Sequence, residues 1–353
     1  MCVTNGLGLG DFDGDDDGML DDWEILHGLS PSNAADATLD ADNDGFINLH
    51  EYWAGTDPND PLEDGSGTAL VAGSRSVDDR IAGKQPTLAT PYYNGFGAGA
   101  YPANTPLTNI VFTLNTDCWL YGVDLSCMSI WSDQIENWST EPLTLISPIH
   151  VMCASHVTPA NGTRVVFRSF AGDLHVRTLV DSKPIFGVAA DDLCIGILDE
   201  PLPSDIKIAR FLPPGYSSYI GTGRRLPYVR IGREKQCAIE DVVFLAPTTT
   251  KSEMIKIEHS IFPARNRYQR PPVAMDSGHP IFFLFGDGLA FLCPTRGFRY
   301  SDHLATGYLC VHYLDTIQFT MNFLSDTTSK NRMMLRKFDL SIYSRLDNFG
   351  GLE

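Results

Sequence analysis

Three observations predict that this is a β-rich protein with a small appended module. From about residue 106, short runs of β-branched and aromatic residues alternate with turn residues, which is typical of an all-β sandwich or barrel. One helical pattern follows them, at residues 315–324. Before them, 17 of the 44 acidic residues crowd into residues 1–64, which contain no Lys or Arg. We therefore expect an all-β domain preceded by an acidic unit of its own.

Composition divides the 353-residue chain into four parts. We expect an acidic module at 1–64, a linker and N-terminal arm at 65–105 rich in Gly, Ser, Pro, Asn and Thr, the β domain at 106–325, and a tail at 326–353. In the helix, Ile317, Met321 and Leu324 recur at helical spacing. The expected strands are Ile110–Leu114, Thr144–Ile146, Val165–Phe170, His175–Val180, Leu193–Leu198, Val242–Leu245, Met254–Glu258, Ile281–Phe285, Leu289–Cys293 and Tyr308–Tyr313.

The charge distribution excludes some partners. The net charge is −18, but it belongs to residues 1–64, because acidic and basic residues nearly balance in the rest of the chain. A nucleic-acid partner needs a basic face, which the chain lacks. No segment reaches the apolar length of a membrane span. A cation is the natural partner of the acidic module.

Two segments of this module share the spacing of a twelve-residue EF-hand loop. Such a loop places oxygen ligands at positions 1, 3, 5, 9 and 12, a backbone carbonyl at position 7 and glycine at position 6, which suits the six to eight hard oxygens that Ca²⁺ requires. The sequence therefore predicts two Ca²⁺ sites. The expected ligands are Asp13, Asp15, Asp17, Met19, Asp21 and Glu24 in the first loop, and Asp40, Asp42, Asp44, Phe46, Asn48 and Glu51 in the second.

The loops resemble the thrombospondin type 3 or dockerin style of calcium repeat found in bacterial secreted proteins, since helices entering the loops are missing and the loops start 27 residues apart. Short helices are expected after each loop, at residues 22–27 and 49–54. Their apolar residues would form a small core of Trp23, Ile25, Leu26, Tyr52 and Trp53. Because so many carboxylates in so little chain repel one another, calcium binding and folding of the module should be coupled.

Three separated motifs supply the residue types of acyl-transfer catalysis, which needs a nucleophile, a base and a carboxylate that orients the base. His156 follows a β-rich run through the small residues Ala154 and Ser155. Asp192 opens an apolar strand, and Ser277 is followed by Gly278, whose backbone freedom helps to expose the hydroxyl. We assign base, carboxylate and nucleophile to His156, Asp192 and Ser277. His150 and Asp191 remain the competing histidine and aspartate.

These motifs resemble the chymotrypsin-like serine proteases over residues 106–325. Ala154-Ser155-His156 is similar to that family's Ala-Ala-His, and Asp276-Ser277-Gly278 matches the core of its Gly-Asp-Ser-Gly-Gly-Pro. The resemblance implies two antiparallel six-stranded β-barrels with a C-terminal helix. It also implies an oxyanion hole made by the backbone N–H groups of Met275 and Ser277. Methionine stands at 275 where the family has glycine, and this departure bears on catalytic efficiency.

The resemblance implies a secreted serine endopeptidase acting on protein or peptide substrates. The alternative is an inactive protease-fold scaffold with a calcium-dependent cell-surface or adhesion role, in which the N-terminal module docks a partner. An extracellular or cell-surface location is expected, with the sequence a fragment that lacks its signal peptide. Arg80-Ile81 resembles an activation cleavage site, although it lies far ahead of His156. Cys118 with Cys127 is the one cysteine pair worth testing for a disulfide.

Overall fold

The computed structural model describes most of the chain and divides it into two compact units. The smaller unit comprises residues 1–72, 218–220 and 343–353, and the larger comprises 73–217 and 221–342. The described residues are 13–44, 46–54, 56–61, 67–84, 91–94, 112–132, 142–185, 192–221, 225–232, 235–243, 256–258, 260, 262–270, 276–299, 304–325 and 333–346.

The smaller unit contains the two acidic loops and the short helices that follow them. These helices, α1 (Asp21–His27) and α2 (Asn48–Ala54), confirm the predicted elements, and the 3₁₀ helix η1 (Asp36–Thr38) lies between them. The core is smaller than expected. Trp23 is buried with its ring 5.0 Å from that of Tyr52, whereas Ile25 and Leu26 are 64% and 76% exposed. The prediction for Ile25 and Leu26 was wrong because α1 turns Trp23 and Glu24 inward.

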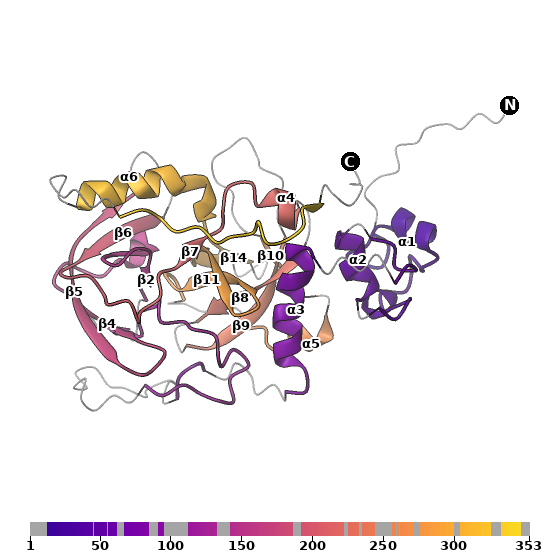
Figure 1. Ribbon diagram of the computed structural model, residues 1–353, viewed down its shortest axis with the longest axis horizontal. Coiled ribbons are helices and arrows are strands. Elements are labelled where there is room, and N and C mark those ends of the chain that lie inside the picture. The colour runs from indigo at the N-terminus through magenta and orange to yellow at the C-terminus, as the bar shows by residue number, and fades with distance from the viewer. Residues whose placement is uncertain are drawn as a thin grey trace. The chain divides into compact units, whose positions relative to one another are not determined.

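The larger unit is built mainly of strands, as predicted. Its first sheet is a curled antiparallel half-barrel with the strand order β1-β4-β5-β6-β3-β2 (Figure 1). Apolar side chains from its inner face, such as Val151, Phe167 and Leu179, form a buried cluster. The strands are β1 (Trp131–Ser132), β2 (Thr144–Leu145), β3 (His150–Ala154), β4 (Arg164–Arg168), β5 (Leu174–Pro184) and β6 (Leu193–Leu198).

Residues 127–132 include the edge strand β1 and also pair with the opposite edge of this sheet, at β2. On the β2 side, Ser129 N donates to Leu143 O at 2.9 Å. On the β4 side, Ile130 N donates to Val166 O at 2.8 Å, and Trp131 lies opposite Val166. The two edge strands of the half-barrel therefore meet through a single stretch of chain.

The second sheet has the order β10-β9-β8-β11-β12-β7. Five strands are antiparallel, but β7 runs parallel to β12, which departs from the purely antiparallel expectation. Beyond β7, Phe211 N donates to Arg336 O and Phe338 N donates to Phe211 O, both at 2.8 Å, so residues 336–338 extend the sheet. The strands are β7 (Arg210–Phe211), β8 (Arg225–Ile231), β9 (Cys237–Val243), β10 (Lys256–Glu258), β11 (Pro280–Phe285) and β12 (Gly288–Pro294).

The predicted C-terminal helix is confirmed as α6 (Leu314–Leu324), which packs on β5 and β6 (Figure 1). The strand predicted at Tyr308–Tyr313 was wrong, because a 3₁₀ turn, η4 (Cys310–Tyr313), leads directly into α6. Helix α3 (Ala69–Ile81) was not predicted, and it lies in the stretch expected as linker and arm. The remaining elements are η3 (Ser155–Val157), α4 (Ser217–Ile220), α5 (Pro263–Asn266), β13 (Gly297–Arg299) and β14 (Leu304–Thr306).

Within the described ranges, no helix has both the length and the apolar character needed to cross a bilayer. The cysteines in these ranges, which are all but Cys2, are free and buried. The Cys118–Cys127 disulfide is therefore not formed in the structure.

Candidate functional site

His156 and Asp192 are brought together by strand pairing. Strand β3 ends at Ala154, which lies opposite Leu193, the first residue of β6. The residues just beyond these strand ends, His156 in η3 and Asp192 before β6, consequently meet at the same edge of the sheet. Asp192 accepts a hydrogen bond from His156 Nδ1 through Oδ2, and one from the His156 backbone N–H through Oδ1 at 2.9 Å.

This contact gives the His156 ring a defined chemical role. A carboxylate at Nδ1 favours the tautomer with its proton on Nδ1, which leaves Nε2 as an acceptor. The side chain is 48% exposed, and Nε2 has no hydrogen-bond partner among the described residues. Asp192 is only 12% exposed. The pair is therefore an oriented base with an accessible nitrogen.

Ser277 lies in the same region but makes no hydrogen bond to His156. Its Oγ donates to Arg296 O at 3.0 Å. Two contacts place it near the dyad. A Cβ added to Gly278, whose φ is +83°, would lie 3.2 Å from Val157 Cγ2, and Arg296 Nε is 3.9 Å from Asp192 Oδ2. The Ser277 hydroxyl is thus bound to a backbone carbonyl, in a turn that approaches the His156 segment.

Asp276, immediately before Ser277, is anchored by a buried arginine that the sequence analysis missed. Arg230 Nη1 is 2.8 Å from Asp276 Oδ2, and Arg230 Nη2 is 3.1 Å from Glu240 Oε1 and also donates to Arg270 O. The side chain of Arg230 is fully buried, and those of the two carboxylates are 2% exposed. This ion-pair network joins β8 and β9 to the segment that carries Ser277.

His150, the competing histidine, has a structural environment. It is fully buried, with Nδ1 2.8 Å from Ser147 Oγ and Nε2 3.0 Å from Ser325 Oγ. Burial lowers the pKa of His150 to about 4. Both ring nitrogens are occupied, so this ring is not available as a base.

Other predicted positions fall outside the described residues or in a helix. Met275, the first oxyanion donor, and Asp191 lie outside the described residues. Arg80 and Ile81, the residues of the expected activation site, end helix α3, and Ile81 is buried. Asp276 forms its ion pair with Arg230, whose side chain is fully buried.

The first acidic loop of the smaller unit is closed by its own carboxylates. Asp13 accepts the backbone N–H groups of Asp17 at 3.1 Å and Gly18 at 2.9 Å, and Asp17 accepts that of Met19 at 2.8 Å. Gly18 has a φ of +96°, as the sharp turn at position 6 requires. Asp13, Asp15 and Asp17 place carboxylate oxygens within 4.8 Å of one another.

The second loop repeats this arrangement. Asp40 accepts Asp44 N at 3.2 Å, and Asp44 accepts Phe46 N at 2.7 Å. Asp40, Asp42 and Asp44 again lie within 4.8 Å of one another. In both loops the residue at position 4 has a positive φ, 60° at Asp16 and 64° at Asn43. The two loops therefore share a left-handed backbone conformation at position 4.

Buried carboxylates test whether these residues fit a cation. Glu24 and Glu51, the position-12 residues, are both fully buried, and neither oxygen of Glu24 has a hydrogen-bond partner. Burial and neighbouring carboxylates raise the pKa of Asp17 to about 7, and those of Glu24 and Glu51 to about 8. Burying such anions is costly unless a cation compensates them. The donor set of oxygens alone fits a hard ion such as Ca²⁺.

The position-9 side chains, which are predicted ligands, also accept hydrogen bonds within their own loops. Asp21 Oδ1 accepts Gly14 N at 2.7 Å, and Asn48 Oδ1 accepts Ala41 N at 3.3 Å. Each therefore ties position 9 of its loop to position 2.

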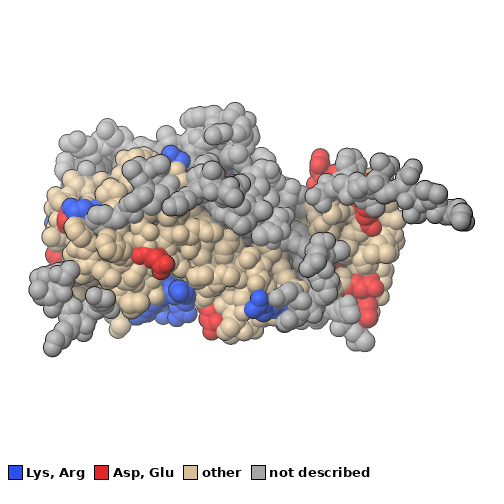
Figure 2. All heavy atoms as spheres, turned by 90° about the horizontal axis from the view of Figure 1, so that it is seen from above, with Lys and Arg blue, Asp and Glu red and all other residues tan. Residues whose placement is uncertain are grey.

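On the face seen in Figure 2, acidic atoms are exposed at several places on this unit.

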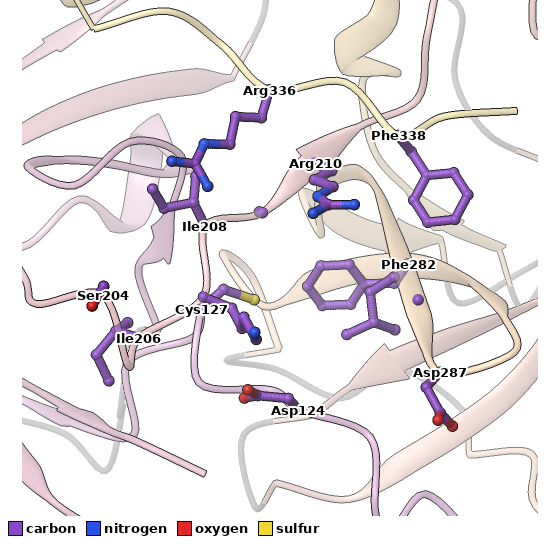
Figure 3. Close-up of a pocket in the computed structure, with 14 residues that line it drawn as sticks. Asp124, Cys127, Ser204, Ile206, Ile208, Arg210, Phe282, Asp287, Arg336 and Phe338 are labelled. Atoms are coloured by element: carbon purple, nitrogen blue, oxygen red, sulfur yellow. The ribbon is translucent and has the colours of Figure 1, made fainter.

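A pocket of about 310 Å³ lies elsewhere in the larger unit, between β7, β12 and residues 336–338. Figure 3 shows Arg210 and Arg336 at one side of it and Asp124 and Asp287 at the other. The lining therefore carries both charges and selects neither an anion nor a cation. None of His156, Asp192 and Ser277 lines this pocket.

No protein-family model and no curated protein matches the chain.

Proposed function

We propose that the larger unit is a serine endopeptidase of chymotrypsin-like fold. The observation that carries this proposal is the contact of His156 Nδ1 with Asp192, which leaves Nε2 accessible, in a segment whose next residue, Val157, approaches Gly278 beside Ser277. An oriented histidine with a half-exposed ring is the arrangement that a general base requires. The proposed fold, with two six-stranded barrels, is supported by the two six-stranded sheets and by residues 127–132, which include one edge strand of the first sheet and also pair with its opposite edge.

In the proposed reaction, the Ser277 hydroxyl turns from Arg296 O toward His156. Ser277 Oγ then attacks the peptide carbonyl carbon while His156 Nε2 takes the hydroxyl proton. When the carbon–nitrogen bond breaks, His156 returns this proton to the leaving amine, and a water molecule repeats the sequence to release Ser277. Asp192 holds the ring and stabilises its charged form. The backbone N–H groups of Met275 and Ser277 are the proposed donors to the oxyanion.

A second candidate function is an inactive scaffold of the same fold. It is favoured by the hydrogen bond from Ser277 Oγ to Arg296 O, which occupies the hydroxyl proton that His156 would have to take. Methionine at position 275 also departs from the family's glycine. If this residue misdirects one oxyanion donor, turnover falls by about 10²–10³-fold. The variant Met275→Gly should then raise activity.

Labelling with a fluorophosphonate probe separates the two candidates. We expect the wild-type chain to be labelled and Ser277→Ala to be unlabelled, with strong reduction in His156→Ala. Ser155→Ala is a matched control, because Ser155 is a neighbouring serine whose Oγ lacks a hydrogen-bond partner in the described structure. Absence of labelling in both wild type and Met275→Gly would favour the scaffold.

We also propose that the smaller unit binds two Ca²⁺ ions through the two loops. The support is the paired geometry of the loops and the buried carboxylates of Glu24 and Glu51. Ions bound there would neutralise the repulsion within each loop and so couple binding to folding. Affinities of the extracellular class, on the order of 10⁻⁴–10⁻³ M or tighter, are expected.

Calorimetric titration of the full chain with Ca²⁺ tests this part. Two sites should appear, and Asp17→Ala and Asp44→Ala should each remove one. No calcium heat at all would rule the calcium module out. An extracellular or cell-surface location, with a surface partner docked through this module, follows as the proposed setting.

A further inference from the structure

We propose that Asp36 is a direct ligand of the first Ca²⁺ ion, supplied from outside the twelve-residue loop. This inference rests on the proposed calcium binding and adds a ligand that the loop pattern does not contain. Asp36 is the first residue of η1, which lies between α1 and the second loop. It is also the one acidic residue in the stretch 25–39 that separates the two loops.

The distances place Asp36 beside two predicted ligands of the first loop. Ligand oxygens of Asp17, Glu24 and Asp36 all lie within 4.8 Å of one another. Oxygens that bind one Ca²⁺ ion at 2.3–2.6 Å lie at most about 5 Å apart. One ion therefore fits in contact with all three side chains, and Asp17 and Glu24 are positions 5 and 12 of the loop.

The two oxygens of Asp36 have different surroundings. Oδ2 accepts the backbone N–H of Ser30 at 2.8 Å, which anchors the side chain. Oδ1 is buried and has no hydrogen-bond partner, and the residue as a whole is only 5% exposed. A purely structural aspartate would need Oδ2 alone. A cation bound among Asp17, Glu24 and Asp36 explains why Asp36 Oδ1 and the carboxylate of Glu24 are buried without a hydrogen-bond partner.

This ligand would add a charge to the first site. The site would gather the side-chain carboxylates of positions 1, 3, 5 and 12 together with Asp36. The corresponding position of the second loop, Glu63, lies outside the described residues. Because the number of charged ligands tunes calcium affinity, Asp36 should tighten binding at the first site.

The second loop also holds Asp36 in place. Asn48, at position 9 of that loop, donates through Nδ2 to Asp36 O at 2.9 Å and through its backbone N–H to Leu39 O at 2.8 Å. Asn48 is fully buried. An ion that orders the second loop therefore fixes the peptide that carries Asp36. Calcium binding at the second site should strengthen binding at the first, and the coupling is reciprocal.

The test is a calcium titration of the full chain by calorimetry, with Asp36→Asn as the variant. Asparagine keeps an oxygen to accept the Ser30 N–H but lacks the second carboxylate oxygen and the charge. We expect about a tenfold or larger loss of affinity at one site, with the other retained. Asp22→Asn is the matched control, because Asp22 is an exposed acid on α1 and the same charge is lost. Its affinities should change by less than about threefold.

Double variants identify the site. In the Asp44→Ala background, which retains the first site, Asp36→Asn should still weaken calcium binding. In the Asp17→Ala background it should add nothing. Unchanged affinity in Asp36→Asn, with two sites intact in the wild type, would overturn the inference and leave the calcium proposal standing. Loss of both sites in Asp36→Asn, or an equal loss in Asp22→Asn, would also overturn it.

Discussion

Replacing Arg230 with leucine tests whether the buried ion-pair network holds the Ser277 segment. Arg230 is fully buried and contacts Asp276 at 2.8 Å and Glu240 at 3.1 Å. Leucine removes the positive charge but leaves both carboxylates in the interior. The substitution therefore exposes the cost of two buried anions that have lost their shared partner.

The magnitude follows from the burial of the network. Breaking a buried ion pair by removing one partner costs about 3–5 kcal/mol, because the remaining charge is left without compensation. At roughly 2–4 °C per kcal/mol for a domain of this size class, the melting temperature should fall by about 6–20 °C. Arg230→Lys retains the charge but cannot bridge the two carboxylates with a planar fork, so its loss should be intermediate.

Thermal unfolding followed by circular dichroism in saturating calcium measures this loss, and the rate of fluorophosphonate labelling measures the effect on Ser277. Arg80→Leu is the control, because Arg80 forms an ion pair with Asp287, whose side chain is 80% exposed. An exposed pair contributes at most about 1 kcal/mol. The reasoning fails if Arg230→Leu lowers the melting temperature no more than Arg80→Leu does.

Three further predictions concern groups near the candidate site. The pKa of buried His150 is about 4 in the folded chain, below the value of about 6.5 for an unfolded histidine. Between these pH values the unfolded chain binds more protons, so the free energy of unfolding should fall as the pH drops from about 6.5 toward 4. Urea titrations at several pH values should show a smaller slope in His150→Gln, and an equal slope would contradict this. Burial lowers the pKa of Lys235 to about 7, so stability should rise between about pH 7 and 10. Lys235→Met should abolish that rise, and its persistence would assign it to another group. Gly278→Ala should lower the free energy of unfolding by about 1–2 kcal/mol, because φ at this position is +83° and the new Cβ would lie 3.2 Å from Val157 Cγ2. An unchanged midpoint of chemical denaturation would argue against this backbone conformation.

Features set by local sequence were predictable. Strand β6 and helix α6 follow from apolar runs and helical spacing, and the clustered carboxylates of the two acidic loops follow from acidic residues at alternate positions. For these elements the information lies in neighbouring residues. The expectation that His156, Asp192 and Ser277 lie in one region comes instead from the resemblance of three separate motifs to a known family.

Features set by pairing across long distances were not predictable. Nothing near Arg230 indicates that its partner is Asp276, 46 residues away, because the pairing depends on how β8 and the Ser277 turn pack. Strand β7, parallel to β12, has two residues and leaves no periodic signal. The direction of the Ser277 hydroxyl is a choice of rotamer, which depends on the position of Arg296 O. Asp36 carried a signal, as the isolated acid between the loops, but its meaning required the folded chain.

The pairing of Phe211 with residues 336–338 bears on the behaviour of the protein at high concentration. A strand at the edge of a sheet presents unpaired N–H and C=O groups that can template pairing with another molecule. Here Phe211 uses its N–H and C=O on Arg336 and Phe338, so this part of the β7 edge is covered by the chain's own C-terminal region. In the first sheet, the segment that contains edge strand β1 also pairs with the other edge strand, β2. A chain cut before residue 333 would keep His156, Asp192 and Ser277, but it would uncover β7 and invite edge-to-edge aggregation.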